Sequence, residues 1–287
     1  MKIEKLYRYP VKSLPGESLD TTFLQSGKGL PGDRQFALTH AASKFLPEAP
    51  GWLTRSNFVT LAHSPQIYSL SCERVAKQNT TETMLRVNNN RQAGTNTVLF
   101  ETDLQQDSPI TIESPALSEL LKDTQPGPYA LVSAPGHSLW DAPFASVSLF
   151  NLASLQALAE TAGIELEPTR FRGNIWFSGV PAWQELDWVN STLTLSPADG
   201  DSKAAEPALQ LRIVERIERC RVINANPLSG KRDAMLTRHL QDHYGHCDFG
   251  VHAEVVRHGH ISVGEHFNLQ VSQASTVNTE NTFKAPF

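Results

Sequence analysis

The stretch RIVERIERCRVINANPLSGKRD, at residues 212–233, combines a strand pattern with the chain's most reactive kind of side chain. Its first half alternates apolar and charged residues, which predicts a β-strand. The turn residues Asn226-Pro227 follow, so Cys220 is expected near a strand end, where functional sites often gather. Arg219 and Arg221 flank this cysteine, and nearby positive charge favours the thiolate, which is both a nucleophile and a soft metal ligand.

The same cysteine has a simpler interpretation. Free cysteines are often small buried apolar side chains, and the two arginines could lie solvated on the opposite face of the strand. Composition by itself favours this structural role over a chemical one. The choice between the two depends on the rest of the chain.

Outside this stretch, short strands outnumber helices. Alternating or apolar runs between turn signals predict strands at residues 2–9, 35–39, 67–72, 83–87, 97–101, 110–112, 175–178, 191–196, 209–215, 252–257 and 262–269. Many short strands with few helices predict a mainly β (α+β) fold, in which a β-barrel core carries peripheral helices beside a β-rich N-terminal region.

Capping residues and apolar periodicity predict three helices. One begins after Ser114, one covers 152–162 between Asn151 and Gly163, and one covers 233–244 before Gly245. Residues 88–90 and 258–260 are predicted to be turns, and residues 197–207 a long exposed loop.

The composition excludes several classes of protein. The chain has 287 residues, a formal net charge of −5 and 40% hydrophobic residues, enough to bury a sizeable core. Negative net charge gives no general attraction to nucleic acid, so any anion site must be local. The cysteines are too few and too widely spaced for a disulfide framework, which fits a reducing compartment. Because no signal-peptide pattern or membrane-spanning apolar run is present, the protein is predicted to be cytoplasmic and not membrane-bound.

Basic and hydroxyl side chains recur beside predicted turns and could meet at one phosphate group. Arginine offers a planar fork of donors that suits phosphate oxygens, while lysine and serine add a point charge and a hydroxyl donor. Any one of these residues is more readily explained as solvated surface, so only their joint occurrence has weight. The set comprises Lys12, Ser13, Asp33, Arg34, Thr54, Arg55, Ser56, Arg170, Arg172 and Asn174.

A second constellation belongs to the third predicted helix and the residues after it. His239 and His243 share one helix face, and His246, Cys247 and His252 come soon after; all are residue types that bind zinc. No glutamate completes an HExxH pattern and no CxxC pair is present. Histidines near a helix end often interact only with the helix dipole. A zinc-binding protein that uses the His239–His252 cluster is therefore an alternative.

Six segments, in this order, resemble MOSC-domain proteins. They are YPVKS (9–13), GDR (32–34), RFRGNIWFSG (170–179), ERCRVINANPLSG (218–230), FGVHAEVV (249–256) and ISVGEHF (261–267). The chain is thus similar to the C-terminal part of molybdenum cofactor sulfurases and to the core of the mitochondrial amidoxime-reducing component. The resemblance implies a MOSC N-terminal β-rich domain at 1–120, a MOSC β-barrel domain at 121–272 and a flexible C-terminal tail at 273–287.

The resemblance also implies a site. In the reductase branch of this family the matching cysteine is the protein ligand of molybdenum, so Cys220 is expected to be the catalytic and metal-binding residue beside a molybdenum–molybdopterin cofactor. Arg219 is expected to lie beside the metal, and residues 54–56 match the family less closely. The motif positions expected to bind the pterin and its phosphate are Lys12, Ser13, Arg34, Arg172 and Asn174.

The implied function is a molybdenum-dependent oxidoreductase that reduces N-hydroxylated small molecules with electrons from a separate donor protein, the cofactor carrying the redox step. Relatives in that branch often have a cysteine three positions before the ligand, where this chain has Ile217, and no cysteine-rich iron–sulfur module follows. The chain is also too short to hold a pyridoxal-phosphate domain, so a complete cofactor sulfurase is not expected. The alternative is a non-catalytic carrier or adaptor that binds the cofactor or receives sulfur on Cys220.

Overall fold

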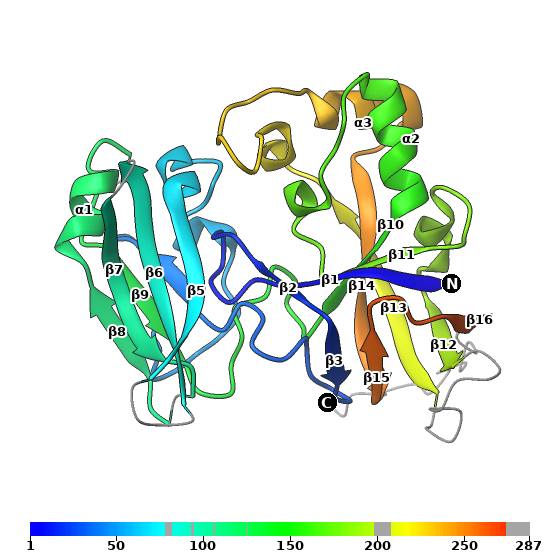
Figure 1. Cartoon of the computed structure of the whole chain (residues 1–287), viewed down its shortest axis with the longest axis horizontal. Helices are drawn as coiled ribbons and strands as arrows, with labels where there is room; N and C mark the ends of the chain where they lie inside the picture. The colour runs from blue at the N-terminus through cyan, green and yellow to red at the C-terminus, as the bar shows by residue number, and fades with distance from the viewer. Residues whose placement is uncertain (78–81, 93–94, 106, 125, 198–207, 274–287) are drawn as a thin grey trace, which may run out of the picture.

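The structure is a computed structural model that describes residues 1–77, 82–92, 95–105, 107–124, 126–197 and 208–273 (Figure 1). Strands dominate these residues and only three α-helices accompany them, so the predicted mainly β fold with peripheral helices is confirmed. The predicted loop at 197–207 and the predicted tail at 273–287 lie outside the described residues, except for the first residue of each. The division of the chain into domains stays a prediction.

One eight-stranded sheet forms the right-hand part of the molecule in Figure 1, with strands in the order β16, β12, β13, β14, β10, β11, β1, β2. The bounds are β1 Lys2–Arg8, β2 Glu17–Leu19, β10 Val147–Asn151, β11 Ile175–Ser178, β12 Ser191–Pro197, β13 Leu209–Glu218, β14 Asp248–Arg257 and β16 Phe267–Gln273. The first strand of the chain therefore shares a sheet with strands from its C-terminal half.

The start of β16, at one end of this sheet, meets the start of β1, near the other end. Ile3 N donates to Glu265 O at 3.0 Å, and Phe267 N donates to Met1 O at 2.8 Å. In the described residues these contacts amount to an isolated bridge and not to a continuous ladder. The core is thus a curled, barrel-like sheet whose strand pairing does not form a closed ring.

A parallel crossover lies at the centre of the sheet. Strands β10 and β11 are parallel and are joined by helix α2 (Leu152–Ala162), as parallel neighbours require. Every residue of β10 is buried, because the strand has the apolar core on one face and helices on the other. The Asn151 side chain accepts a hydrogen bond from Ala153 N at 3.0 Å and Gly163 ends the helix at φ 67°, so the predicted caps of this helix are confirmed.

Helix α2 and helix α3 (Leu236–Tyr244) lie together at the top of the right-hand part in Figure 1, and α2 packs on β10 and β11. An aromatic cluster fills the space between them and the strands. Phe171 and Phe249 have ring centroids 4.3 Å apart, and Phe150 stacks on Trp176 at 4.8 Å. This cluster also forms the floor beneath residues 170–174.

Gly173 lies against this cluster so closely that a Cβ atom there would collide with the Phe150 ring. We expect Gly173→Ala to lower the free energy of unfolding by about 1–3 kcal/mol, because Phe150 would have to move within a packed core. Urea unfolding followed by circular dichroism measures this change. Gly51→Ala is the matched control, because nothing lies within 4 Å of the position that a Cβ atom would take there, and it should be neutral or slightly stabilising. Equal stability of the two variants would contradict the packing argument.

Three smaller sheets complete the fold. Two of them, with helix α1, form the left-hand part of Figure 1 around an apolar core that includes Phe36, Ile67 and Leu131. The sheet β5-β6-β7 comprises Leu70–Ala76, Thr83–Gln92 and Thr95–Asp103; β4-β9-β8 comprises Ala37–Thr39, Ala130–Ser133 and Ile110–Glu113; α1 is Pro115–Leu121. Strand β3 (Thr21–Leu24) pairs with β15 (Gly259–Ser262). Short 3₁₀ helices cover Arg55–Asn57, Pro65–Ser69, Pro168–Phe171, Gln184–Trp188 and Arg221–Asn224.

Two predicted turns are wrong. Residues 88–90 lie inside β6, where the buried Asn88 side chain donates to Glu73 Oε1 at 2.7 Å. Residues 259 and 260 belong to β15, which pairs with β3 instead of turning back on β14. The single strand predicted at 262–269 is in fact the end of β15 and the start of β16, with a break between them. None of the helices that the structure describes is long and apolar enough to cross a membrane.

Candidate functional site

A cavity of about 610 Å³ opens between the curled sheet and the N-terminal half of the chain. One part of the lining comes from residues 12–62. The other part comes from β10, β13 and β14, from Asp141 before β10, and from the segments at 171–172 and 219–222. Six lysine or arginine and three aspartate or glutamate residues line it, although the whole chain carries a net charge of −5. The cavity thus has an excess of three positive charges, which favours an anionic ligand.

Cys220 lies in the wall of this cavity, just beyond the end of β13. It is the N-terminal cap residue of the 3₁₀ helix at Arg221–Asn224, and its thiol is free and partly buried. Arg219 lines the same cavity, whereas Arg221 is exposed and does not. Of the two arginines that flank Cys220 in the sequence, one therefore shares the cavity with the thiol.

Three cavity residues have a left-handed backbone: Ser13 at φ 71°, Arg34 at φ 50° and Arg172 at φ 56°. They are three of the five non-glycine residues with positive φ in the described part of the chain. Such a backbone costs about 1–3 kcal/mol per residue and persists only where the surrounding structure holds it. Strain of this kind concentrates at binding and catalytic sites, so it supports the cavity as the functional site.

Arg34 is fixed by a buried ion pair. Its Nη1 donates to Asp33 Oδ2, while Asp33 Oδ1 accepts from Tyr9 N at 2.7 Å. Its Nη2 donates to Arg172 O at 3.3 Å, and both guanidinium groups lie over the Tyr9 ring, with Cζ 5.4 and 4.4 Å from its centroid. Burial alone would lower the pKa of Arg34, but Asp33 and Asp141 raise it above the usual range. The Arg34 guanidinium therefore stays charged.

Lys12 holds a different part of the wall. It is 4% exposed, and its ammonium donates to Leu139 O at 3.0 Å, Trp140 O at 3.2 Å and Asp141 Oδ1 at 2.6 Å. Arg34 Nε donates to the second carboxylate oxygen of Asp141 at 3.2 Å. Burial would raise the pKa of Asp141, but the charges of Lys12 and Arg34 lower it far below the usual range. Lys12 thus fixes the 139–141 segment and has no donor left for a ligand.

Arg172 and Arg219 have donors that no described residue uses. Arg172 Nη1 donates to Leu14 O, and Arg219 Nη2 donates to Phe171 O at 2.8 Å. Among the described residues, Arg172 Nη2 and Arg219 Nε are buried without a hydrogen-bond partner, which costs about 1–3 kcal/mol for each group. Burial lowers the pKa of Arg172, and it lowers the pKa of Arg219 to about 10, so both remain cationic at neutral pH. Arg172 and Arg219 therefore place two charged side chains in the cavity wall, each with one buried donor that no described residue uses.

Two family models match the sequence. The MOSC N-terminal beta barrel domain matches residues 1–124, and the MOSC domain matches residues 137–268. The chain belongs to the MOSC family. MOSC domains are associated with the molybdenum cofactor.

A comparison with solved structures finds the YUAD protein from Bacillus subtilis, with 13% sequence identity and a TM-score of 0.42 over 94% of this chain and 95% of that chain. A comparison with proteins of curated function finds no match.

In this MOSC protein, most of the residues predicted to bind the cofactor lie together. The cavity is lined by Lys12, Ser13, Arg34, Arg172, Arg219 and Cys220, and by Thr54 and Arg55 of the less closely matching segment. Asn174 is not in the wall. It is 2% exposed, its Oδ1 accepts from Ser148 Oγ at 2.9 Å and its Nδ2 donates to Tyr7 O at 3.2 Å. Since Ser148 does line the cavity, Asn174 supports the wall from behind. The roles of these residues stay a prediction.

The MOSC cavity also includes residues that sequence reasoning missed or assigned elsewhere. Asp141 has no motif of its own, and its partners Lys12 and Arg34 are more than 100 residues away along the chain. His252 was grouped with the zinc candidates, but it lines the cavity, and its Nδ1 is buried with no partner among the described residues. The FGVHAEVV segment was the available signal for it.

His252 should make the stability of the protein depend on pH. Burial, with Arg34 and Arg219 nearby, lowers its pKa to about 4, against about 6.5 in the unfolded chain. As the pH falls from 6.5 to 4, the unfolded chain binds the proton first, so the folded state loses about 2–3 kcal/mol. His252→Gln should remove this loss, measured as the difference in free energy of unfolding between pH 7 and pH 4.5. The exposed His243→Gln serves as the control; a His252→Gln profile parallel to that of the wild type would argue against the assignment.

The predicted zinc cluster does not assemble. His239 and His243 stack on α3 with ring centroids 5.9 Å apart, Cys247 Sγ lies 3.5 Å from Thr237 O, and His252 lines the MOSC cavity. In the part of the chain that the structure describes, no group of three or more His, Cys, Asp or Glu side chains is placed to hold a metal ion. The zinc alternative therefore has no structural support.

Proposed function

We propose that this MOSC protein binds the molybdenum cofactor in the cavity beside Cys220 and reduces N-hydroxylated small molecules. The observation that carries the proposal is that one positively charged cavity contains a free thiol together with the unpartnered donors of Arg172 and Arg219. A molybdenum–molybdopterin group offers a soft metal to the sulfur and a phosphate to the arginines. At about 610 Å³ the cavity also has the size of an ordinary cofactor site.

Each residue has a distinct part in this proposal. Cys220 is the protein ligand of the metal, and the guanidinium groups of Arg172 and Arg219 in the cavity wall bind anionic oxygens of the cofactor. Arg34 adds a positive charge, because Asp33 and Asp141 keep its guanidinium protonated, and three of its donors bind groups within the wall. His252 is neutral at pH 7, so it can orient a polar substrate group without adding charge to the site. When bound, the cofactor would supply the two-electron redox chemistry.

The overall reaction is R–NHOH + 2 H⁺ + 2 e⁻ → R–NH₂ + H₂O. The nitrogen–oxygen bond is broken, the nitrogen is reduced, and the oxygen leaves as water. The electrons come from a separate donor protein in this proposal, and the substrate is a small molecule. The free cysteines favour action in a reducing compartment such as the cytoplasm. The negative net charge disfavours nucleic acid as a partner.

Purification without oxygen, followed by metal analysis and pterin fluorescence, tests the proposal. We expect molybdenum and pterin in equal amounts, and conversion of a hydroxamic acid to the amide with reduced methyl viologen as an artificial donor. Molybdenum and pterin without any turnover would favour the carrier or adaptor. Absence of both from protein made in a host that synthesises the cofactor would refute cofactor binding.

A further inference from the structure

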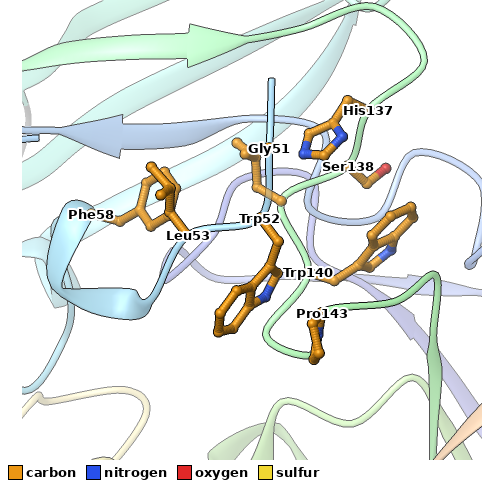
Figure 2. Close-up of a pocket in the computed structure, with 9 residues that line it drawn as sticks. Gly51, Trp52, Leu53, Phe58, His137, Ser138, Trp140 and Pro143 are labelled. Carbon is orange, nitrogen blue, oxygen red and sulfur yellow. The ribbon is translucent and has the colours of Figure 1, made fainter. Parts of the chain in front are cut away.

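A second cavity, of about 140 Å³, adjoins the first, and Figure 2 shows its walls. Trp52, Phe58 and Trp140 give this cavity three large aromatic lining side chains. Trp52 and Leu53 line both cavities, so the two spaces meet at these residues. In Figure 2 the Trp52 ring lies between Leu53 and Phe58 on one side and Trp140 and Pro143 on the other.

The two cavities are also joined through the backbone. Leu139 and Trp140 line the smaller cavity, and Asp141, the next residue, lines the larger one. The Lys12 ammonium binds the carbonyl oxygens of the first two and the carboxylate of the third. A single buried charge therefore fixes the segment that bounds both spaces, and their relative position is set by the fold.

The size and chemistry of the smaller cavity suit one flat ring. An engineered apolar cavity of about 150 Å³ in another protein binds benzene, and aromatic walls favour stacked or edge-on contact with a further ring. His137 and Ser138 are the polar side chains among its lining residues. Burial lowers the pKa of His137, so the neutral imidazole offers hydrogen bonding without charge. A neutral ring fits this cavity better than a charged group.

We infer that the smaller cavity is a subsite for an aromatic ring of the substrate, whose N-hydroxylated group lies in the larger cavity beside Cys220. The inference rests on the proposed function, and it adds the substrate class: aromatic N-hydroxylated compounds. Trp52 stands at the junction and is 44% exposed, so it can contact a ring that enters from the open larger cavity. Trp52 is thus a specificity-determining residue in this scheme.

Calorimetric titration with three hydroxamic acids tests the inference by binding alone. Benzohydroxamic acid carries the ring, acetohydroxamic acid carries a methyl group, and cyclohexanecarbohydroxamic acid has similar bulk without aromaticity. We expect the phenyl compound to bind at least about tenfold more tightly than the methyl compound, because it buries a ring. Its affinity should also exceed that of the cyclohexyl compound.

Two variants address the cavity in opposite ways. Trp52→Ala removes the shared wall, and because this side chain is partly exposed the variant should fold. Ser138→Leu fills the space instead. In both, the phenyl-to-methyl preference should fall to about threefold or less. Ser138→Leu, whose position lines the smaller cavity and not the larger one, should keep the molybdenum and pterin contents of the wild type. Phe23→Ala is the matched control, since Phe23 is an aromatic residue with similar exposure, 41%, that lines neither cavity.

The outcomes separate this inference from the proposed function. Equal affinity for the phenyl and methyl compounds, or for the phenyl and cyclohexyl compounds, in protein that contains molybdenum and pterin would overturn the aromatic subsite and leave the proposed function intact. A preference unchanged in both cavity variants would overturn it too. A ring preference that disappears in both variants, in protein without molybdenum or pterin, would support the subsite and count only against the proposed function.

Discussion

Cys220→Ser is expected to lose most of its bound molybdenum and more than about 100-fold of the reductase activity. The substitution replaces a soft thiolate with a hydroxyl that binds the metal weakly. Loss of an outer-shell partner of a metal site already costs about 10–100-fold in affinity or activity, and a direct ligand should cost more. The measurements are the molybdenum content of protein purified without oxygen and the rate of hydroxamic acid reduction.

Cys247→Ser provides the matched control for this experiment. It makes the same chemical change at another free, partly buried cysteine, whose Sγ lies 3.5 Å from Thr237 O and which does not line the cavity. It should keep the metal content and the rate of the wild type. Full metal content and full activity in Cys220→Ser would remove Cys220 from the role of ligand.

Asp33→Asn is expected to lower the free energy of unfolding by about 3 kcal/mol. Asp33 is 1% exposed and accepts hydrogen bonds from Tyr9 N and from Arg34 Nη1. Removing one partner of a buried ion pair costs about 3–5 kcal/mol because the other charge stays buried. Arg34 keeps Asp141 as a second partner, so the lower end of that range applies. Urea unfolding of wild type and variant gives the difference.

An exposed ion pair offers the comparison. Glu119 of α1 is 73% exposed and pairs with Lys122, the C-cap residue of this helix, so Glu119→Gln should change the stability by less than about 0.5 kcal/mol. Asp33→Asn should also retain less molybdenum cofactor, because Arg34 would lose its fixed position next to Arg172. A stability within about 0.5 kcal/mol of the wild type would contradict the role given to Asp33.

Elements with strong local signals were predictable from the sequence. Helix α2 was predicted with its bounds and both caps, because the Asn151 side chain and Gly163 act on backbone groups of their own helix. The turn predicted at residues 88–90 is wrong because the partner of Asn88 is not local. Asn88 satisfies its amide through Glu73 on the neighbouring strand, and a cross-strand partner cannot be recognised from turn propensity.

The residues of the candidate site could be predicted from the sequence, but the contacts that each of them makes could not. The motifs named Lys12 and Arg34, but only the structure shows that their donors are engaged by Asp141 and other parts of the wall. Charge pattern alone cannot distinguish a cation that binds a ligand from one that supports the wall. Arg221 shows the same limit, since it neighbours Cys220 in sequence but does not line the cavity.

The walls of the larger cavity also have an implication for biosynthesis. They extend along the chain from Lys12, near its start, to His252 on β14. A ribosome releases the chain from the N-terminus onward, so no complete cavity exists until residue 252 has emerged. A ligand that contacts both walls can therefore be fully enclosed only after residue 252 has left the ribosome.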